Sequence, residues 1–410
     1  MPNTPQPTAL DGLKIVELAT FVSAPYCAKL LADMGAEVVK VEEPLHGDSS
    51  RARGPYPGDI PHPEKSGLFI YLNTNKKSVT LNLNDPAGRD ILLELLKEAD
   101  LFIHDRTADE AKELGIDYPS LRRLNPRLIV TSVTPFGHTG PYAGYKAHNL
   151  NITHAGSEGY VLPGGYANRM KPEGPPVKIG GHAGDYDGGI AAAVGAMAAL
   201  MARELHGVGQ HVDASRQEAN IALNRVLFVT YLTEDKVYRR ATRNYYFGGL
   251  YPTSDGYVAL RPSEDKQWWL FSEKVMERPD LSHDPRFDTR PDRVRNGKEF
   301  DAIVADWSRR FTKQQIFDKC IEAGVPVGPF ATAKEVADSP QIRFRRYFQE
   351  IAHPVAGKVT IPTAAHQFAK TPWRLRHPPP QLGEHNKEIL GGRIGLTGEE
   401  LGILRSNGVI

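Results

Sequence analysis

The sequence lacks most of the features that mark secreted, metal-binding or membrane-spanning proteins. Its 410 residues include two cysteines, Cys27 and Cys320, which form no CxxC, zinc-type spacing or disulfide framework. The first residues, MPNTPQPTALDGLK, lack the basic and apolar segments of a signal peptide. No run approaches the roughly 18 apolar residues of a membrane span. We therefore expect a cytoplasmic protein with no metal and no membrane partner.

The sequence also lacks an excess of either charge. Fifty lysines and arginines stand against 49 aspartates and glutamates, so the net charge is +1. This balance gives no electrostatic reason to expect a nucleic-acid partner. The hydrophobic share of 40% and the charged share of 24% are those of an ordinary globular protein. Because single cores stop growing at roughly 250–300 residues, two lobes are expected.

Strand-like and helix-like segments alternate in the first third of the chain. Asp85-Pro86 opens a predicted helix at 87–99, and Gly35 stands where a helix would end before the next strand. Such alternation is typical of parallel strands joined by helices, and it predicts a doubly wound α/β domain. The predicted strands are 13–18, 37–41, 78–84, 100–105 and 128–137.

The rest of the chain changes character twice. Residues 138–184 are rich in Gly, Pro, Tyr and His with little periodicity, which predicts a long functional loop. A helix of small residues at 190–205, a strand at 208–215 and a helix from Arg216 follow. A hairpin at 250–260 and three charged helices (263–277, 296–310 and 313–323) then indicate a smaller α+β lobe. The expected division is a large domain at 1–228, a small domain at 229–330 and a segment at 331–410 that returns to the large domain.

One acidic residue stands out just before the helix of small residues. In GDYDGG, Asp185 lies near the start of that helix, where an Asp is most often an N-cap. The functional interpretation is a carboxylate presented to a cleft, with backbone N–H groups nearby to stabilise negative charge. The flanking glycines, including Gly188 and Gly189, would admit a ligand or another backbone. Spacing alone does not choose between Asp185 and Asp187.

Other candidate residues are weaker. His148, at the start of the glycine-rich loop, is by itself more typical of a structural hydrogen-bonding residue than of a catalyst. No His, Asp or Glu grouping has the spacing of a metal site. Neither GxGxxG after the first strand nor GxxxxGK[ST] occurs, so dinucleotide and P-loop functions lose their expected motifs.

Five segments in order resemble the class III CoA-transferase family, which includes formyl-CoA:oxalate and carnitine CoA-transferases. The quoted similarity covers LDGLKIVEL with LLADMGAEVVKVEEP, NTNKKSVTLNLNDPAGRDILLELLKEAD, LNPRLIVTSVTPFGHTGPY, the block from GD to GVGQHVDAS, and the closing AGVPVGPFATAKEVADSPQ and PPPQLGEHNKEIL. The resemblance implies a Rossmann-like large domain, a small domain, and a ring-shaped chain that forms an interlocked dimer. It also implies that acyl-CoA and a carboxylic acid are the substrates.

The resemblance further implies roles for individual residues. Asp185 would attack a donor thioester, giving an aspartyl anhydride and then an aspartyl-CoA thioester, with His148 beside it. The residues implied to contact CoA are Val22, Ser23, Leu81, Asn84, Asp105 and Lys146. Glu43, where a transferase may carry Arg, and Asp105-Arg106, in place of an Asn-Phe pair, depart from the family pattern.

Two alternatives stay open within this resemblance. The related α-methylacyl-CoA racemases use a His and an Asp as opposed acid and base, and His148 and Asp185 fall on those positions. The chain would otherwise be a non-catalytic subunit of a heteromeric transferase. The expected assembly is therefore either a homodimer or a heteromer with a related subunit. Aromatic residues near Arg169 and Arg243 suggest a bulky or dicarboxylic acid, with succinyl-CoA as the donor.

Overall fold

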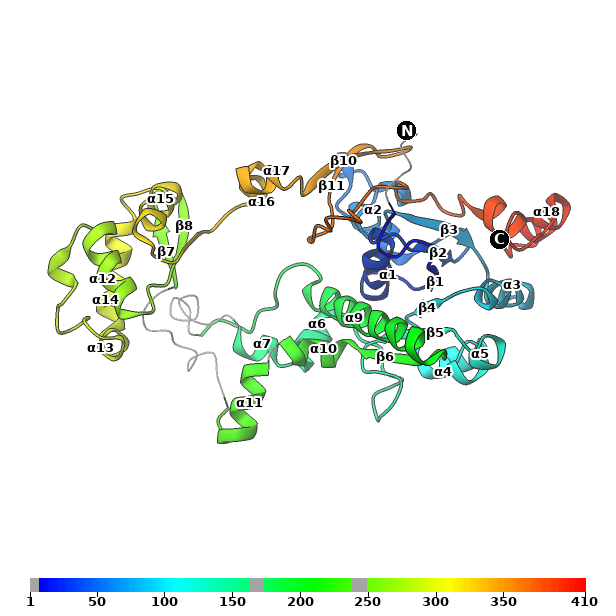
Figure 1. Ribbon diagram of the computed structural model, residues 1–410, viewed down its shortest axis with the longest axis horizontal. Coiled ribbons are helices and arrows are strands. Elements are labelled where there is room, and N and C mark those ends of the chain that lie inside the picture. The colour runs from blue at the N-terminus through cyan, green and yellow to red at the C-terminus, as the bar shows by residue number, and fades with distance from the viewer. Residues whose placement is uncertain (1–6, 163–172, 224, 238–248) are drawn as a thin grey trace. The chain divides into compact units, whose positions relative to one another are not determined.

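The computed structural model describes residues 7–162, 173–223, 225–237 and 249–410. It groups the chain into two compact units (Figure 1). The first unit comprises Met1–Gly156, Ile179–Arg225 and Arg343–Ile410, and the second comprises Ser157–Lys178 and Val226–Ile342. The expected domain boundaries at residues 228 and 330 concern parts of the chain that would fold separately, and they stay predictions.

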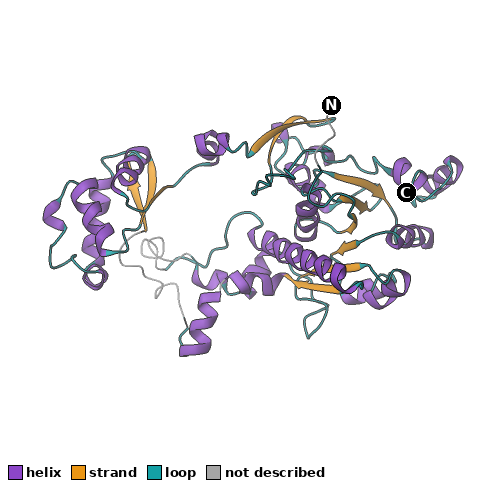
Figure 2. Ribbon diagram, viewed as in Figure 1, coloured by secondary structure: helices purple, strands orange, loops and turns teal. Residues whose placement is uncertain are grey.

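The first unit is built on a parallel sheet of six strands in the order β3-β2-β1-β4-β5-β6, drawn in orange in Figure 2. All five neighbouring pairs are parallel. Along the chain, successive strands are added first on one side of β1 and then on the other. The switch point of the sheet therefore lies between β1 and β4, where open α/β sheets bind ligands. The strands are β1 (Lys14–Leu18), β2 (Glu37–Glu42), β3 (Lys76–Thr80), β4 (Leu101–His104), β5 (Ile129–Thr134) and β6 (His211–Ser215).

Helices connect these strands, and a hairpin lies in the C-terminal part of the same unit. The helices are α1 (Ser23–Asp33), α2 (Gly67–Leu72), α3 (Pro86–Lys97), α4 (Ala108–Glu113), α5 (Tyr118–Leu124), α6 (Asn149–Ala155), α9 (Ala183–His206), α10 (Arg216–Leu223) and α18 (Gly398–Ser406). Short 3-10 turns cover Ser49–Ala52, Pro57–Asp59 and Pro63–Lys65, and one π-helical turn covers Lys387–Gly391. The hairpin pairs β10 (Phe348–His353) with β11 (Gly357–Pro362).

The alternation of side chains along the strands produces two cores, one on each face of the sheet. Val16 and Val39 pack on one face with α3 and the C-terminal residues, whereas their neighbours Ile15 and Val38 pack on the other with α1 and α9. Because successive strand residues point to opposite faces, continuous apolar runs are what a sheet covered on both sides requires. The runs recognised in the sequence are therefore buried strands.

The second unit holds an antiparallel three-stranded sheet and short helices. Its core contains Trp268, which is almost fully buried and packs against Phe300 with ring centroids 4.8 Å apart. Its elements are α7 (Glu158–Val161), β7 (Gly249–Thr253), β8 (Gly256–Leu260), α12 (Asp265–Leu270), a π-helical turn (Phe271–Val275), a 3-10 turn (Pro279–Leu281), α13 (Arg290–Arg295), α14 (Gly297–Ser308), α15 (Lys313–Ala323), β9 (Val327–Pro329) and α16 (Ala333–Asp338). The helices α11 (Arg225–Glu234) and α17 (Pro340–Phe344) cross the boundaries between the units.

Most expected elements are confirmed, and two expectations need correction. The segment 138–184 was expected to lack regular structure, but α6 and α7 form within it and α9 already begins at Ala183. The sequence analysis missed them because these helices are short and carry few periodic apolar residues. The strand expected at 78–84 ends at Thr80, since Asp85 caps α3 by accepting a hydrogen bond from Ala87 N and the residues before it form a turn.

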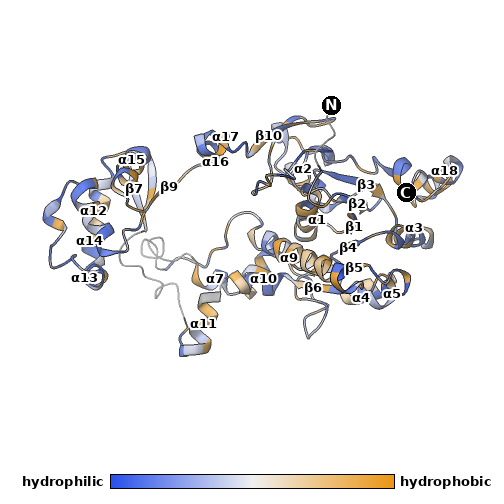
Figure 3. Cartoon of the chain, viewed as in Figure 1, coloured by the Kyte–Doolittle hydropathy of each residue, from blue (hydrophilic) through white to orange (hydrophobic). Residues whose placement is uncertain are grey.

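Helix α9 is apolar along most of its length (Figure 3). By length and composition it could cross a membrane, but 44% of its most apolar window is buried inside the protein. Its buried face packs on α1 and the sheet, which is how the core helix of an α/β domain behaves. Its other face exposes Ile190, Val194, Met201 and Leu205. We call these four residues the exposed α9 stripe.

Charged side chains are buried near the carboxyl ends of the first strands. Lys40 Nζ lies 2.7 Å from both Glu17 Oε1 and Asp48 Oδ2, and none of the three side chains is exposed. Lys76 Nζ lies 2.7 Å from the other Glu17 oxygen. Taking such charges out of water is costly unless each is paired, and here each acid has a lysine. Asp48 in turn accepts a hydrogen bond from Phe21 N at 2.9 Å, so the network also fixes the turn after β1.

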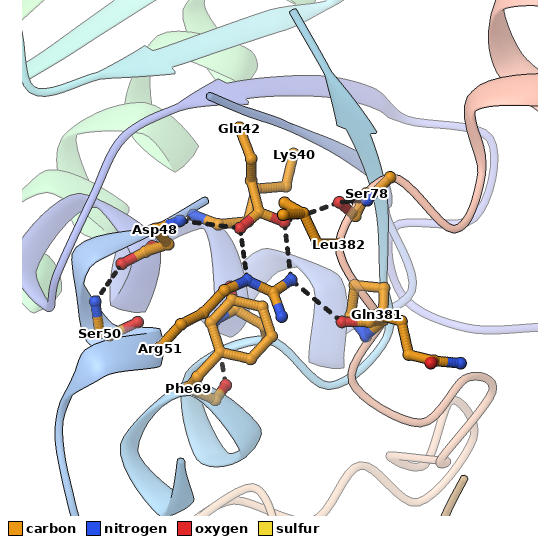
Figure 4. Close-up of polar contacts among 12 residues, drawn as sticks. Lys40, Glu42, Asp48, Ser50, Arg51, Phe69, Ser78, Gln381 and Leu382 are labelled. Carbon is orange, nitrogen blue, oxygen red and sulfur yellow. Dashed lines mark hydrogen bonds and ion pairs between the residues drawn. The ribbon is translucent and has the colours of Figure 1, made fainter. Parts of the chain in front are cut away.

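A second part of this network centres on Arg51, whose guanidinium forks onto Glu42 (Figure 4). Its Nε and Nη2 donate to the two carboxylate oxygens at 2.8 and 2.9 Å. Nη1 donates to Glu64 at 2.8 Å, and the guanidinium lies 3.6 Å from the centroid of the Phe69 ring. Nη2 also reaches the carbonyl oxygen of Pro380 at 3.2 Å. Arg51 therefore joins the N-terminal strands to the C-terminal segment.

The C-terminal segment also covers the exposed edge of the sheet. Ser78 Oγ in β3 accepts a hydrogen bond from Gly383 N at 3.0 Å, and Ser78 O accepts one from His385 N at 2.9 Å. Asn386 Oδ1 accepts a bond from Thr80 N at 2.8 Å. Edge strands left bare invite aggregation, so this cover protects the last strand of the sheet.

We predict that Arg51→Ala destabilises the first unit by about 3–5 kcal/mol, because it leaves the Glu42 carboxylate buried without its cation. The measurement is the midpoint of urea-induced unfolding followed by circular dichroism. The matched control is Arg278→Ala, which removes an equally forked but solvent-exposed pair with Asp280. The control should leave the midpoint unchanged, and equal midpoints for both variants would contradict the importance of the buried fork.

Candidate active site

Asp185 lies in the first turn of α9 and is completely buried. The structural interpretation of the sequence, which made Asp185 the N-cap, is wrong. His182 holds that position and makes no side-chain capping bond. The carboxylate stands instead inside the positive end of a helix of 24 residues. Asp187, the other acidic candidate, is half-buried, and burial raises the pKa of its carboxyl group. The two acids thus differ in burial, since Asp185 is completely buried and Asp187 only half-buried.

The carboxylate of Asp185 has one close cationic partner. Arg216 Nη1 donates to Oδ1 at 2.7 Å, and Nη2 donates to the carbonyl oxygen of Ala147 at 2.7 Å. Oδ2 lies 3.6 Å from His182 Nδ1 and has no hydrogen-bond partner among the described residues. Buried polar atoms are usually hydrogen-bonded, so a buried carboxylate oxygen without a donor requires an explanation.

The glycines of GDYDGG serve the packing of neighbouring helices. A Cβ at Gly188 would lie 2.8 Å from Arg216 Cγ, and one at Gly189 would lie 2.6 Å from the carbonyl oxygen of Ser23 in α1. The sequence analysis expected these glycines to admit a ligand or another backbone. In the first unit they admit α1 and the side chain of Arg216, which reaches Asp185 only because position 188 has no side chain.

Two cavities lie at the switch point of the sheet, and the second is lined by Arg216, the partner of Asp185. The first, of about 480 Å³, is lined near the ends of β1, β2 and β3 and includes Leu81, Asn84 and Glu110. The second, of about 530 Å³, includes Val22, Ser23, Asp105, Lys146, His148 and Arg216. Thr20, Ser49, Arg106 and Glu110 line both, so the two cavities are contiguous.

The structure brings together all the residues expected at the site except one. Seven of them line the two cavities, whereas Asp185 lines neither and is separated from the second by Arg216. His148 is an exposed residue at the start of α6, and its backbone N donates to Asn151 Oδ1 at 3.1 Å. The sequence analysis missed Arg216 and Arg106. Their position in the sequence was the signal, because Arg216 follows directly after β6 and Arg106 lies two residues after the end of β4.

The acidic residues near the cavities are largely neutralised by the fold. Asp105 Oδ2 accepts hydrogen bonds from Thr20 N at 2.8 Å and Thr20 Oγ1 at 3.0 Å, which ties the end of β4 to the turn after β1. Glu42 is held by Arg51, and Asp48 by Lys40. Of the departures from the family pattern, Glu43 alone is exposed at the wall of the first cavity.

Three histidines support the wall that contains Arg106. His138 Nε2 lies 2.9 Å from the carbonyl oxygen of Arg106, and its ring is 5.6 Å from His104 and 5.2 Å from His211. Burial, then the neighbouring His138 and His211, holds the pKa of His104 well below its usual range. Burial and His138 also lower the pKa of His211. In the part of the chain that the structure describes, no group of three or more His, Cys, Asp or Glu is placed to hold a metal ion.

We predict that acid destabilises the protein through these histidines. His104 binds a proton in the unfolded chain below about pH 6.5 but not in the folded one, so stability falls as the pH drops through that value, by up to about 1.4 kcal/mol per pH unit per histidine. His104→Leu should make thermal unfolding less sensitive to pH between 4.5 and 6.5. Exposed His206→Leu is the control. An unchanged pH dependence in His104→Leu would refute the assignment.

Comparisons with known proteins agree on one family. The model of CoA-transferase family III matches residues 10–386. The chain is 32% identical to succinyl-CoA–D-citramalate CoA-transferase of Chloroflexus aurantiacus over 98% of each chain. It is 30% identical to the beta subunit of succinyl-CoA–L-malate CoA-transferase of the same organism over 100% of each chain. A CaiB/BaiF family protein from Brucella suis has a crystal structure that superposes with a TM-score of 0.81, at 29% identity, over 94% of this chain and 100% of that one.

The match extends over nearly the whole chain and includes both the switch point of the sheet and the start of α9. The relatives named above that have an assigned activity transfer CoA between an acyl-CoA and an acid. The chain therefore belongs to CoA-transferase family III and is an enzyme of that class.

Proposed function

We propose that the enzyme transfers CoA from an acyl-CoA thioester to a carboxylic acid by covalent catalysis on Asp185. The observation that carries the proposal is the buried carboxylate at the positive end of α9, with one oxygen held by Arg216 and the other without a donor. A carboxylate is a weak nucleophile in water, and burial removes the water that would otherwise solvate it.

The proposed cycle has four transfers. Asp185 attacks the donor thioester and expels CoA thiolate, which gives a mixed anhydride. The thiolate attacks the aspartyl carbonyl, releases the donor acid and leaves an aspartyl-CoA thioester. The acceptor carboxylate then attacks this thioester, and the thiolate finally takes the acyl group from the new anhydride. Because Asp185 lines neither cavity, the cycle requires the wall of the second cavity beside Arg216 to open toward Oδ2 when acyl-CoA binds, while Arg216 stays on Oδ1.

We assign the two contiguous cavities to CoA. Leu81 and Asn84 line the first and suit the adenine end, whereas Val22, Ser23 and Lys146 line the second and suit the arm that carries the thioester. Asp105 contributes by fixing the turn after β1 through its bonds to Thr20. Arg106 and Lys146 offer positive charge to the phosphates.

The acid–base alternative has less support. A racemase would need His148 and Asp185 to face one substrate from opposite sides, whereas the relatives named above are CoA-transferases. We propose His148 as a polar residue of the cavity wall. Deuterium uptake at the carbon next to the thioester would identify a racemase directly.

We predict that Asp185→Asn lowers kcat by about 10⁴-fold or more, because the amide cannot form the anhydride. The measurement is exchange between an acyl-CoA and a free acid, followed by mass spectrometry of the thioesters. Hydroxylamine added together with acyl-CoA should modify Asp185 of the wild-type enzyme. Asp187→Asn is the matched control and should keep activity and trapping. Full activity in Asp185→Asn would remove the proposed nucleophile.

We propose that the enzyme acts as a dimer in which a second chain covers the exposed α9 stripe. A row of large apolar side chains on one face of a long helix is typical of a surface that another chain covers. Since one relative is named as a beta subunit, the partner is a second copy or a related chain. The interlocked, ring-like arrangement implied by the family is part of this proposal.

We predict that Val194→Glu yields a monomer, because it places a charge in the middle of the α9 stripe. Light scattering coupled to size-exclusion chromatography measures the mass in solution. Ile403→Glu on α18 introduces the same charge at another exposed apolar position and should leave the dimer intact. A dimeric Val194→Glu enzyme would show that the stripe is not the interface.

We propose succinyl-CoA as the donor and a dicarboxylic acid as the acceptor, in the cytoplasm. The relatives that use succinyl-CoA with citramalate and malate support this substrate class. Arg169 and Arg243, which suggested a dicarboxylic acid in the sequence analysis, lie outside the described residues. The same holds for the nearby aromatic residues Tyr166, Tyr245, Tyr246 and Phe247. Screening acyl-CoA donors against a panel of acids by mass spectrometry would identify the pair.

A further inference from the structure

The two oxygens of the Asp185 carboxylate have different surroundings. Oδ1 accepts a hydrogen bond from Arg216 Nη1 at 2.7 Å. Oδ2 has no hydrogen-bond partner within the described ranges, although His182 Nδ1 lies 3.6 Å away. One oxygen is thus held in place, and the other accepts no hydrogen bond from the described residues, in a side chain that is completely buried.

The contact between Arg216 and Asp185 differs from a purely structural ion pair in the same chain. Arg51 binds both oxygens of Glu42 in a fork, and Asp48 N and Ser78 Oγ donate to the same carboxylate. Arg216 binds its carboxylate end-on and gives its second Nη to the carbonyl oxygen of Ala147. A fork would protect both oxygens from reaction, whereas the end-on contact leaves Oδ2 available.

Arg216 is held firmly in this orientation. Its Nη2 is anchored to Ala147 O at 2.7 Å, and its side chain is 12% exposed. Its Cγ occupies the space that a side chain at position 188 would fill, because a Cβ there would lie at 2.8 Å. A donor that is already oriented, in a site of low dielectric, stabilises developing charge without rearrangement.

We propose that Arg216 is a catalytic residue that fixes Oδ1 of Asp185, so that Oδ2 alone attacks the donor, and then stabilises the charge that forms on Oδ1. The inference rests on the covalent role of Asp185 proposed above. It assigns different fates to the two oxygens: Oδ1 stays with the enzyme through every turnover, and Oδ2 leaves.

The atoms balance as follows. Oδ2 forms a bond to the acyl carbon, the carbon–sulfur bond breaks, and the thiolate leaves. The thiolate then adds to Cγ of Asp185, and the electron pair of the carbonyl moves to Oδ1, beside Arg216 Nη1. Collapse restores the carbonyl and breaks the bond from Cγ to Oδ2, so the donor acid departs with Oδ2. The acceptor carboxylate later supplies a new oxygen at that position.

Isotope labelling tests this assignment in the wild-type enzyme. The enzyme is incubated with succinyl-CoA and succinate whose carboxylates carry heavy oxygen, until the label in the thioester proves many turnovers. The peptide that contains Asp185 is then analysed by mass spectrometry. We expect one labelled oxygen in its carboxylate, because Oδ1 cannot exchange places with Oδ2. Two labelled oxygens would overturn the role of Arg216 and leave the covalent mechanism standing, whereas no label would overturn the covalent mechanism itself.

Variants of Arg216 provide the second test. Arg216→Gln should lower kcat by about 10²–10³-fold, with little change in the KM for acyl-CoA, and should admit two labelled oxygens because the carboxylate can rotate between turnovers. Arg216→Lys keeps the charge and should recover part of kcat. Gly188→Ala keeps both charged groups but crowds Arg216 Cγ, so it should also admit two labels.

The matched control is Arg203→Gln, at the other end of α9. Arg203 is buried and pairs with Asp100 at 2.9 Å, so the change removes the same kind of contact away from the site. It should keep one labelled oxygen and the wild-type kcat. An Arg216→Gln enzyme that is folded by circular dichroism and retains the wild-type kcat would overturn the proposal. If Arg216→Gln does not fold, the wild-type label count and Arg216→Lys still decide.

Discussion

The buried charge network near the ends of β1, β2 and β3 is the constraint on which the ligand-binding edge of the sheet depends. Lys40 pairs with Glu17 and Asp48, and Asp48 accepts a hydrogen bond from Phe21 N. The turn after β1, which borders both cavities, is therefore fixed by a buried charge pair. Arg51 extends the network to the C-terminal segment. Buried pairs contribute little net stability but cost much when broken. The network thus fixes one conformation of the cavity wall rather than adding much to its stability.

This arrangement explains how an acidic wall is compatible with a phosphorylated ligand. The sequence places Glu42, Asp48 and Asp105 near the switch point, which suggests repulsion of phosphate. In the folded chain two of these carboxylates are paired with cations and Asp105 is occupied by Thr20, while Arg106 and Lys146 line the cavities. Charge counted along a sequence therefore overstates the negative charge of a wall in which these three carboxylates already have partners.

The sequence predicted the sheet well because its signal is local. Continuous β-branched runs such as Val38-Val39 are typical of strands covered on both faces, and the glycines between them mark the turns. The position of Asp185 was predictable too, since a helix of small residues begins beside it. Arg216 was not, because its contact joins residues 31 positions apart and depends on the missing side chain at Gly188. Short helices such as α6 carry too few residues to show a period.

In the proposed mechanism, the partner of Asp185 determines what kind of nucleophile it is. A carboxylate buried without any cation would be driven toward its protonated, unreactive form, and one held in a complete fork would be stable but inert. A single end-on contact lies between these limits, since it supplies a cation and leaves one oxygen free. The glycine at position 188 and the carbonyl of Ala147 together enforce that geometry. In the proposed mechanism, the small residues at the start of α9 thus contribute to chemistry by deciding where an arginine can lie.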